Sequence, residues 1–185
     1  MSHEKLKGAL SSDIFPHLKD NDTKHAAVLV VIYGNDPKVI MTEKPKTMSL
    51  HAGEISFPGG KHSREDYDLL ETAIRETREE ISLVVSRKDI IGQLNPVQTR
   101  NSGFTIVPFV TILPDVPSLH ANLEVEEILS MPLFPLLRTI RLDENEEHRS
   151  LFEAYMLTYS DKIVWGASAR ILKQISDLFK KNDLI

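Results

Sequence analysis

Three glutamates near the middle of the sequence, Glu76, Glu79 and Glu80, have a spacing that suits metal chemistry. With about 100° between successive residues, a helix would place them together on one exposed side. Carboxylates this close repel one another unless something positive lies between them, and hard cations such as Mg²⁺ or Mn²⁺ prefer oxygen ligands. The spacing therefore predicts a divalent-metal site, and Arg75, one turn before Glu79, is placed to orient that side chain.

A glutamate-rich helix is more often only a solvated surface, so the context decides. The segment Phe57-Pro-Gly-Gly60 precedes the glutamates at short range. Glycine has no side chain in the way, so the Gly59-Gly60 backbone can approach a phosphate or donate a carbonyl to the same ion. This combination favours metal-bound phosphoryl chemistry.

The glutamates are predicted to lie on a helix over residues 68–83. Asp68 and Glu71 have the spacing of a capping box at its start. Apolar or small side chains then recur at helical intervals and can pack on a sheet; they are Leu70, Ile74, Thr77 and Ile81.

The rest of the chain alternates between strand and helix patterns. An N-terminal helix or arm over residues 4–20 is expected to break near Pro16. A hairpin is predicted over 25–42 and a short strand over 53–57, followed by a tight turn at 58–60. Further strands are predicted at 90–97, 105–113, 123–131, 151–159 and 162–165, and a closing amphipathic helix at 167–181.

Composition limits the class of protein. The 185 residues suit one domain, predicted at 24–182, preceded by an arm at 1–23. A net charge of −5 argues against broad nucleic-acid binding, and the absence of cysteine means that any metal has oxygen or imidazole ligands. The longest apolar stretch, Ala26 to Tyr33, is too short to cross a bilayer, so we expect a cytoplasmic protein without a membrane partner. The oligomeric state stays open, with a homodimer as one alternative.

The segment Arg75-Glu76-Thr-Arg-Glu79-Glu80-Ile-Ser82-Leu83 resembles the signature of the Nudix hydrolases. Ser82 replaces the usual glycine, Thr77 takes an often apolar position, and an earlier glutamate of the general signature falls at Tyr67. The resemblance implies an α/β/α sandwich with a mixed β-sheet. It also implies a metal-dependent hydrolase that cleaves the diphosphate linkage of a nucleoside diphosphate derivative.

Within this family the chain is most similar to the coenzyme A diphosphatase branch. The gap from Gly60 to Arg75 is one residue longer than in the general signature, and Asp66 and Asp68 form an Asp-x-Asp pair. The branch's upstream pattern maps onto Thr42, Lys44, Gly53 and Phe57 to Gly60, with Ser49 where a second arginine is usual. The likeness continues to about residue 180 and implies cleavage of coenzyme A into 4′-phosphopantetheine and adenosine 3′,5′-bisphosphate.

The resemblance implies a role for each residue of the cluster. Glu76 and Glu80 would be the principal metal ligands and the Gly60 carbonyl an additional one. Glu79 would either bind a further ion or accept the proton from water. Residues expected near the substrate phosphates are Gly59, Lys44 and Lys61, with Lys46 and Arg64 as further candidates.

Other interpretations stay open at the level of the sequence. The same helix would serve a Nudix hydrolase for ADP-ribose, NADH or dinucleoside polyphosphates, and a catalytically silent nucleotide sensor is a third alternative. A distant base among Glu124, Glu126 and Glu127 competes with an exposed strand that has alternating charges. Tyr155 and Trp165 could stack on adenine or pack in the core, and neither His51 nor His62 has a recognisable partner.

Overall fold

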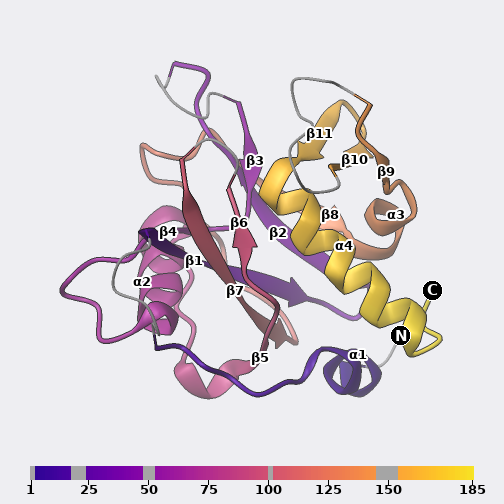
Figure 1. Ribbon diagram of the computed structural model, residues 1–185, viewed down its shortest axis with the longest axis horizontal. Helices are drawn as coiled ribbons and strands as arrows, with labels where there is room; N and C mark the ends of the chain where they lie inside the picture. The colour runs from indigo at the N-terminus through magenta and orange to yellow at the C-terminus, as the bar shows by residue number, and fades with distance from the viewer. Residues whose placement is uncertain (1–2, 18–23, 48–52, 100–101, 145–153) are drawn as a thin grey trace.

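A mixed β-sheet with a hydrophobic core on each face organises the chain (Figure 1). The computed structural model describes residues 3–17, 24–47, 53–99, 102–144 and 154–185. Within these residues the main sheet has the strand order β3-β2-β1-β7-β5, while β4 also pairs with β1, β6 with β7 and β8 with β2. Its strands are β1 (Lys24–Tyr33), β2 (Lys38–Glu43), β3 (Ile55–Ser56), β4 (Gly59–Lys61), β5 (Ile90–Gln93), β6 (Val97–Gln98), β7 (Phe104–Leu113) and β8 (Glu127–Pro132).

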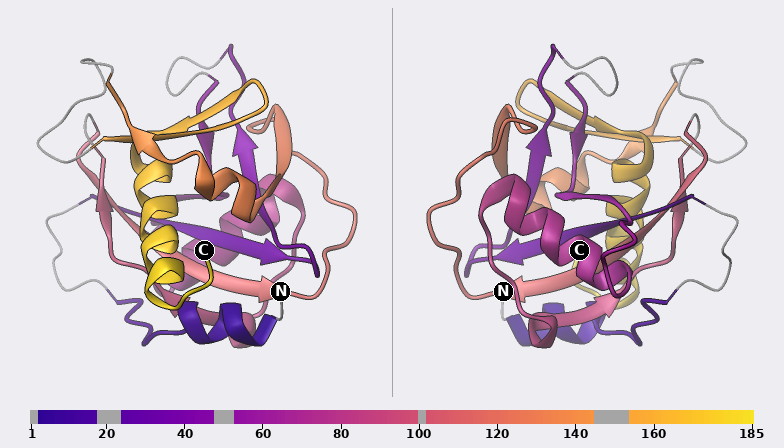
Figure 2. Two further views of the ribbon diagram at one scale, coloured as in Figure 1. Left: turned by 90° about the vertical axis from the view of Figure 1, so that its right-hand side faces the viewer. Right: turned by 90° about the vertical axis from the view of Figure 1, so that its left-hand side faces the viewer.

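Helices cover both faces of this sheet, as the two views of Figure 2 show. On one face lies α2 (Leu69–Ile81), followed by a short 3-10 helix, η1 (Arg87–Asp89). On the other face lie α1 (His3–Leu10), α3 (Leu133–Arg138) and α4 (Gly166–Lys181), together with a small sheet of β9 (Arg141–Leu142), β10 (Tyr155–Tyr159) and β11 (Lys162–Trp165). This arrangement confirms the expected α/β/α sandwich with a mixed sheet.

Strand β1 shows why the sequence folds into layers. Successive side chains of a strand point to opposite faces, so a strand covered on both faces has a continuous apolar run. Ala27, Leu29 and Val31 pack in the core beneath α2, whereas Val28 and Val30 pack in the core beneath α4. β1 pairs in parallel with β7 from Lys24–Phe104 to Tyr33–Leu113.

One edge of β1 is shared by two partners. Near its end, Ile32 pairs with Val39 of β2, and near its start, Ala27 pairs with Gly60 of β4. The predicted turn at 58–60 is therefore wrong in part, because Gly59 and Gly60 continue as a short antiparallel strand. The predicted hairpin of β1 and β2 is confirmed.

Three further segment predictions need correction. The segment 90–97 contains two strands, because the pairing with β7 is interrupted between Leu94 and Val97, where Asn95 donates its amide to Gln174 and Pro96 has no amide hydrogen to donate. The segment 123–131 becomes a strand only at Glu127, and Leu123 is 99% exposed. The N-terminal helix ends at Leu10, well before Pro16.

The remaining elements follow the sequence patterns closely. Strand β11 and helix α4 are found where they were predicted, and β10 begins at Tyr155, while 151–153 lie outside the described residues. Leu6 and Leu10 of α1 are buried in the core beneath α4, so the N-terminal helix packs against the body of the domain. No helix in the described part of the chain is long and apolar enough to span a membrane.

Helix α2 is held at both ends. The Asp68 side chain caps the first turn by accepting a hydrogen bond from the Glu71 amide at 2.9 Å, and it also forms an ion pair with Arg87 at 2.6 Å. At the other end Ser82 adopts a left-handed conformation with φ of 58°, which is the conformation that favours glycine at this position. The predicted helix start is confirmed, with its last helical residue at Ile81.

The Asp68 cap gives a first test. Burial alone would raise the pKa of Asp68, but hydrogen bonds from Arg87 and the Glu71 amide outweigh it and lower this pKa from 3.8. We expect Asp68→Ala to lower the free energy of unfolding by about 2 kcal/mol at pH 7, because the cap is lost together with the ion pair between the buried Asp68 and the exposed Arg87. Urea denaturation measures the change.

The pH dependence of this effect has a definite sign. Because the folded pKa of Asp68 lies below the unfolded value of 3.8, its stabilisation is complete above that pH and is lost as pH falls through the folded pKa. The difference between wild type and Asp68→Ala should therefore be smaller at pH 3 than at pH 7. Asp13→Ala, at an exposed position, is the control, and an equal loss in both variants would contradict the assignment.

Candidate active site

The contact between Glu76 and Gly60 defines the centre of the site. Gly60 lies on β4, which packs against α2, and a Cβ atom at residue 60 would lie 2.5 Å from Oε1 of Glu76. Only glycine leaves room for the carboxylate there. Burial, followed by the neighbouring Glu80 and Glu79 charges, raises the pKa of Glu76, while Arg75 opposes this shift. The structure thus brings the predicted Gly60 backbone and Glu76 together.

Glu80 lies beneath β4 and is almost fully buried, at 2% exposure. Its Oε1 accepts from the Lys44 ammonium at 2.5 Å, and its Oε2 accepts from the Gly59 amide at 3.1 Å. Burial raises the pKa of Glu80, and these two partners oppose the shift. The expectation that Glu80 projects from an exposed helix face is therefore wrong, because the edge of the sheet covers it.

Arg75 organises the exposed side of the cluster. Its guanidinium donates two hydrogen bonds to the Asp66 carboxylate, at 2.7 and 3.0 Å, and one to Glu79 at 3.0 Å. It also contacts Glu76 at 2.9 Å. The hydrogen bonds from Arg75 lower the pKa of Asp66 to about 2, so this anchor stays negative. The predicted orientation of Glu79 by Arg75 agrees with these contacts.

The loop before β8 brings another acidic residue to the site. The amides of His120 and Asn122 donate to the carbonyls of Ile81 and Glu80, so the loop follows the end of α2. Glu124 then lies near enough for its charge to raise the pKa of Glu80. Of the downstream glutamates, Glu124 therefore approaches the cluster.

Glu127 lies in β8 and, unlike Glu124, is directed toward the small sheet. It starts β8 and accepts a hydrogen bond from Lys162 at 2.7 Å. The same ammonium also donates to Glu43 on β2, so it links β11 of the small sheet to the main sheet. Glu127 therefore serves the packing of the two sheets.

The donor set fits a hard divalent cation. Carboxylate and carbonyl oxygens from Glu76, Glu79, Glu80 and Gly60 are the ligand types such ions prefer, and the Glu76 carboxylate reaches the Gly60 backbone because residue 60 has no Cβ. Among the described residues, no three acidic or histidine side chains are already gathered into one metal-binding group. Arg75 instead pairs with Glu79, and Lys44 pairs with Glu80.

The predicted substrate-binding residues divide into two groups. Lys44 is part of the cluster through Glu80, and Gly59 is bound to the same carboxylate by its amide. Lys61 directly follows Gly60 but reaches the ring of Phe104, 5.3 Å from its centroid. Lys46 and Arg64 are exposed side chains.

The other aromatic and histidine candidates lie elsewhere. Tyr155 packs against the core beneath α4, and Lys173 lies 5.2 Å from its ring centroid. Trp165 ends β11 and directly precedes α4. His62 has a partner after all, because its Nδ1 lies 3.0 Å from Oγ1 of Thr72, whereas His51 is outside the described residues.

Sequence reasoning missed three partners in this site. The sequence marks Asp66 only as half of an Asp-x-Asp pair, and no local spacing indicates its contact with Arg75. The ion pair between Lys44 and Glu80 joins residues 36 positions apart, so no local spacing indicates it. The contact between Lys61 and the Phe104 ring likewise joins two different strands, so no local spacing indicates it.

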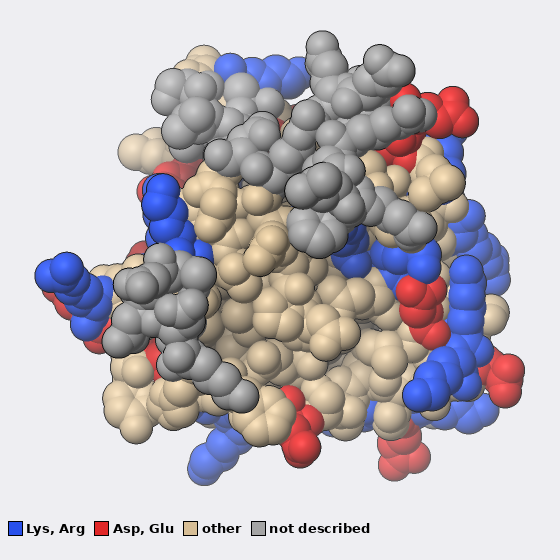
Figure 3. All heavy atoms as spheres, in the orientation of Figure 1, with Lys and Arg blue, Asp and Glu red and all other residues tan. Residues whose placement is uncertain are grey.

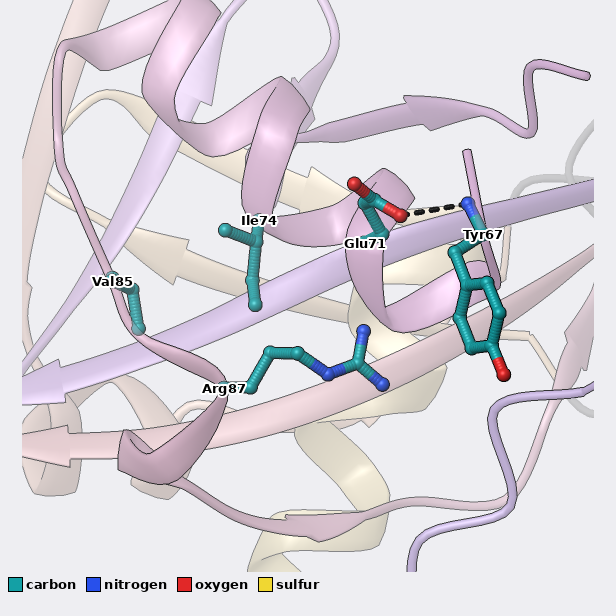
Figure 4. A pocket seen from close by; sticks show the side chains of 5 residues that line it. All are labelled: Tyr67, Glu71, Ile74, Val85 and Arg87. Atoms are coloured by element: carbon teal, nitrogen blue, oxygen red, sulfur yellow. Dashed lines mark hydrogen bonds between the residues drawn. The ribbon is translucent and has the colours of Figure 1, made fainter. Parts of the chain in front are cut away.

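A separate hollow of about 400 Å³, called the outer hollow below, lies between α2 and the segment that leads into η1 (Figure 4). Ile74 and Val85 form its apolar wall, and Tyr67 is 77% exposed at its rim. Glu71 accepts a hydrogen bond from the Tyr67 amide at 2.7 Å. The glutamates of the candidate site do not line this hollow. Tyr67, which stands where the general signature has a glutamate, therefore lies at this hollow and not at the glutamate cluster.

Comparison with known sequences identifies the family. A sequence model of the NUDIX domain matches residues 23–155. The "Uncharacterized Nudix hydrolase NudL" of Yersinia enterocolitica is 33% identical over 159 residues, which cover 84% of this chain and 81% of that protein. The protein of the same name from Photorhabdus laumondii is 34% identical over 167 residues, which cover 86% of each.

Solved structures show the same fold at low sequence identity. A MutT/nudix family protein from Enterococcus faecalis aligns with a TM-score of 0.59 and 16% identity, covering 91% of this chain but 64% of that one. A NUDIX hydrolase from Alicyclobacillus acidocaldarius aligns with a TM-score of 0.55 and 19% identity, covering 84% and 92%. With a family match over most of its length and the signature glutamates on α2, the chain belongs to the Nudix family and is a hydrolase of diphosphate bonds.

Proposed function

We propose that this hydrolase cleaves coenzyme A into 4′-phosphopantetheine and adenosine 3′,5′-bisphosphate, with Mg²⁺ or Mn²⁺ held by Glu76, Glu80 and the Gly60 carbonyl. The observation that carries the metal role is the close approach of the Glu76 carboxylate to Gly60, where a Cβ would lie 2.5 Å from it. A bound divalent cation would neutralise phosphate charge and lower the pKa of a water molecule.

The choice of coenzyme A rests on the loop between β4 and α2. This loop contains the extra residue and the Asp-x-Asp pair of the coenzyme A branch, and each aspartate has its own task. Asp66 anchors Arg75 beside the cluster, whereas Asp68 caps α2 and pairs with Arg87. The branch pattern thus corresponds to distinct contacts that position the catalytic helix.

Glu79 and Lys44 have separate roles in the proposed hydrolysis. Water attacks one phosphorus atom, a new P–O bond forms, and the bridging P–O bond breaks. Arg75 holds Glu79 at 3.0 Å, and Glu79 is the carboxylate that accepts the proton of the water in this proposal. Lys44, paired with Glu80 at 2.5 Å, supplies a positive charge beside the diphosphate.

The direct test is product identity. We expect purified protein with Mg²⁺ or Mn²⁺ to convert coenzyme A into the two products named above, as identified by mass spectrometry. ADP-ribose, NADH and diadenosine polyphosphates are the competing substrates, and EDTA should remove the activity. Preferential cleavage of one of these competitors would replace coenzyme A in the proposal, and cleavage of none would refute it and favour the alternative of a nucleotide sensor.

Glu80→Gln tests the buried ligand. Loss of the charge should lower kcat/KM at least about a hundredfold, since a ligand of the cation is neutralised. Glu71→Gln, on the same helix but lining the outer hollow, is the matched control. Circular dichroism checks that both variants fold, and Mn²⁺ titration followed by electron paramagnetic resonance should show weaker binding for Glu80→Gln only. Full activity of Glu80→Gln would refute its role.

Gly60→Ala tests the contact on which the site is built. The added methyl group would displace the Glu76 carboxylate, so we expect a loss of activity of at least about tenfold with little change in thermal stability. Gly8→Ala is the control, since nothing lies within 4 Å of a Cβ there. Wild-type kinetics in Gly60→Ala would show that the position of Glu76 is not critical.

A further inference from the structure

We propose that Lys24, Lys61 and Phe104 form a clamp for a phosphate monoester that the substrate carries outside its scissile diphosphate. This inference rests on the proposed function, because coenzyme A has such a group on its ribose. The three residues are called the lysine clamp below. It lies on the face of β4 opposite the Gly60 contact with Glu76 and would determine which diphosphate derivatives the enzyme prefers.

Two ammonium groups gather around one aromatic ring in the lysine clamp. The Lys24 ammonium lies 5.7 Å from the Phe104 ring centroid, and the Lys61 ammonium lies 5.3 Å from it. Phe104 is half-buried, and both lysines are exposed. Within the described residues neither lysine forms an ion pair with a carboxylate. The clamp therefore presents two positive charges that the described part of the protein does not neutralise.

The ring alone does not explain this arrangement. A cation–π contact at an exposed site contributes about 0.5–1 kcal/mol, while the two like charges around the ring repel one another. An anion between them removes this repulsion, and lysine is a common ligand of phosphate. Phe104 meanwhile holds both side chains in place, so less freedom is lost when the anion binds.

The β-sheet fixes the position of the lysine clamp relative to the cluster. Lys24 is paired with Phe104 across β1 and β7, and Lys61 is paired with Ala26 across β4 and β1. Figure 1 shows the start of β1 and β4 side by side next to α2. Successive residues of a strand face opposite sides, so Lys61 leaves β4 on the side away from the Gly60 contact with Glu76. A ligand of both sites must therefore bend around the edge of β4.

A hollow lies farther along this part of the sheet. Thr105, which follows Phe104 in β7, lines a hollow of about 690 Å³ together with residues of β6 and α4, whereas the three clamp residues do not line it. Arg170 also lines it and donates a hydrogen bond to the Gln98 carbonyl. Figure 3 shows a largely uncharged centre in the described part of this view, with both basic and acidic side chains near its margin.

The experiment compares two substrates that differ only in the phosphate. Coenzyme A and 3′-dephospho-coenzyme A are assayed with wild type, Lys24→Gln and Lys61→Gln. We expect the wild type to prefer coenzyme A and Lys24→Gln to reduce this preference about tenfold, mainly through KM. Lys61→Gln should reduce it similarly. Lys7→Gln, an exposed lysine on α1, is the charge-matched control and should keep the preference.

Product binding gives a second measurement that does not depend on turnover. Calorimetric titration should show that wild type binds adenosine 3′,5′-bisphosphate more tightly than 5′-AMP, and that Lys24→Gln loses most of this difference. Phe104→Leu, which keeps an apolar side chain but no aromatic ring, should lose part of it. Thermal unfolding confirms that the variants are folded.

The outcomes separate the lysine clamp from the proposed function. If Lys24→Gln lowers the activity on both substrates equally, or changes neither, the clamp is refuted even though coenzyme A is hydrolysed. If wild type cleaves neither substrate, the proposed function fails. The titration then decides the clamp alone, because equal affinities for the bisphosphate and the monophosphate would refute it.

Discussion

The arrangement of the site depends on one buried carboxylate. A charged group removed from water is strongly destabilising unless partners surround it, and Glu80 is 2% exposed. Its two partners come from different parts of the chain, Lys44 after β2 and the Gly59 amide on β4. Satisfying this carboxylate therefore sets the position of α2 against the sheet edge. Glu76 then meets Gly60 as a consequence of the same docking.

Around this buried pair, the loop before α2 combines stability and chemistry. Asp68 and Arg87 hold the start of the helix, and Asp66 holds Arg75, which in turn positions Glu79. Two aspartates separated by one residue thus hold the start of the helix and the Arg75 guanidinium. The helix end and the proposed metal ligands are placed by the same short segment.

Much of the fold and of the candidate site could be predicted from the sequence, because the interactions that determine these features are local. The Asp68 cap, the periodicity of α2 and the apolar run of β1 are determined by neighbouring residues, and they were predicted correctly. Gly60 and Glu76 were selected together because their types and spacing suit one chemistry. The sandwich itself came from the family resemblance, since periodicity alone allowed other mixed folds.

What the sequence did not reveal depends on distant contacts. The helical wheel placed Glu80 with Glu76 and Glu79 on an exposed face, because a wheel contains no information about the strand that covers the helix. Glu124 and Glu127 have the same residue type within one segment, yet only the fold of that segment directs them to different places. Gly59 and Gly60 indicate a turn locally, but pairing with β1 makes them a strand.

The shared edge of β1 has a wider consequence. β1 pairs with β2 near Ile32 and with β4 near Ala27, so β4 occupies only a short stretch of that edge. Gly59 and Gly60 of this three-residue strand contact Glu80 and Glu76 of α2. A shift of β4 by one residue along β1 would therefore displace the backbone from both carboxylates at once. The register of one very short strand thus sets the spacing between the sheet and the acidic face of the helix.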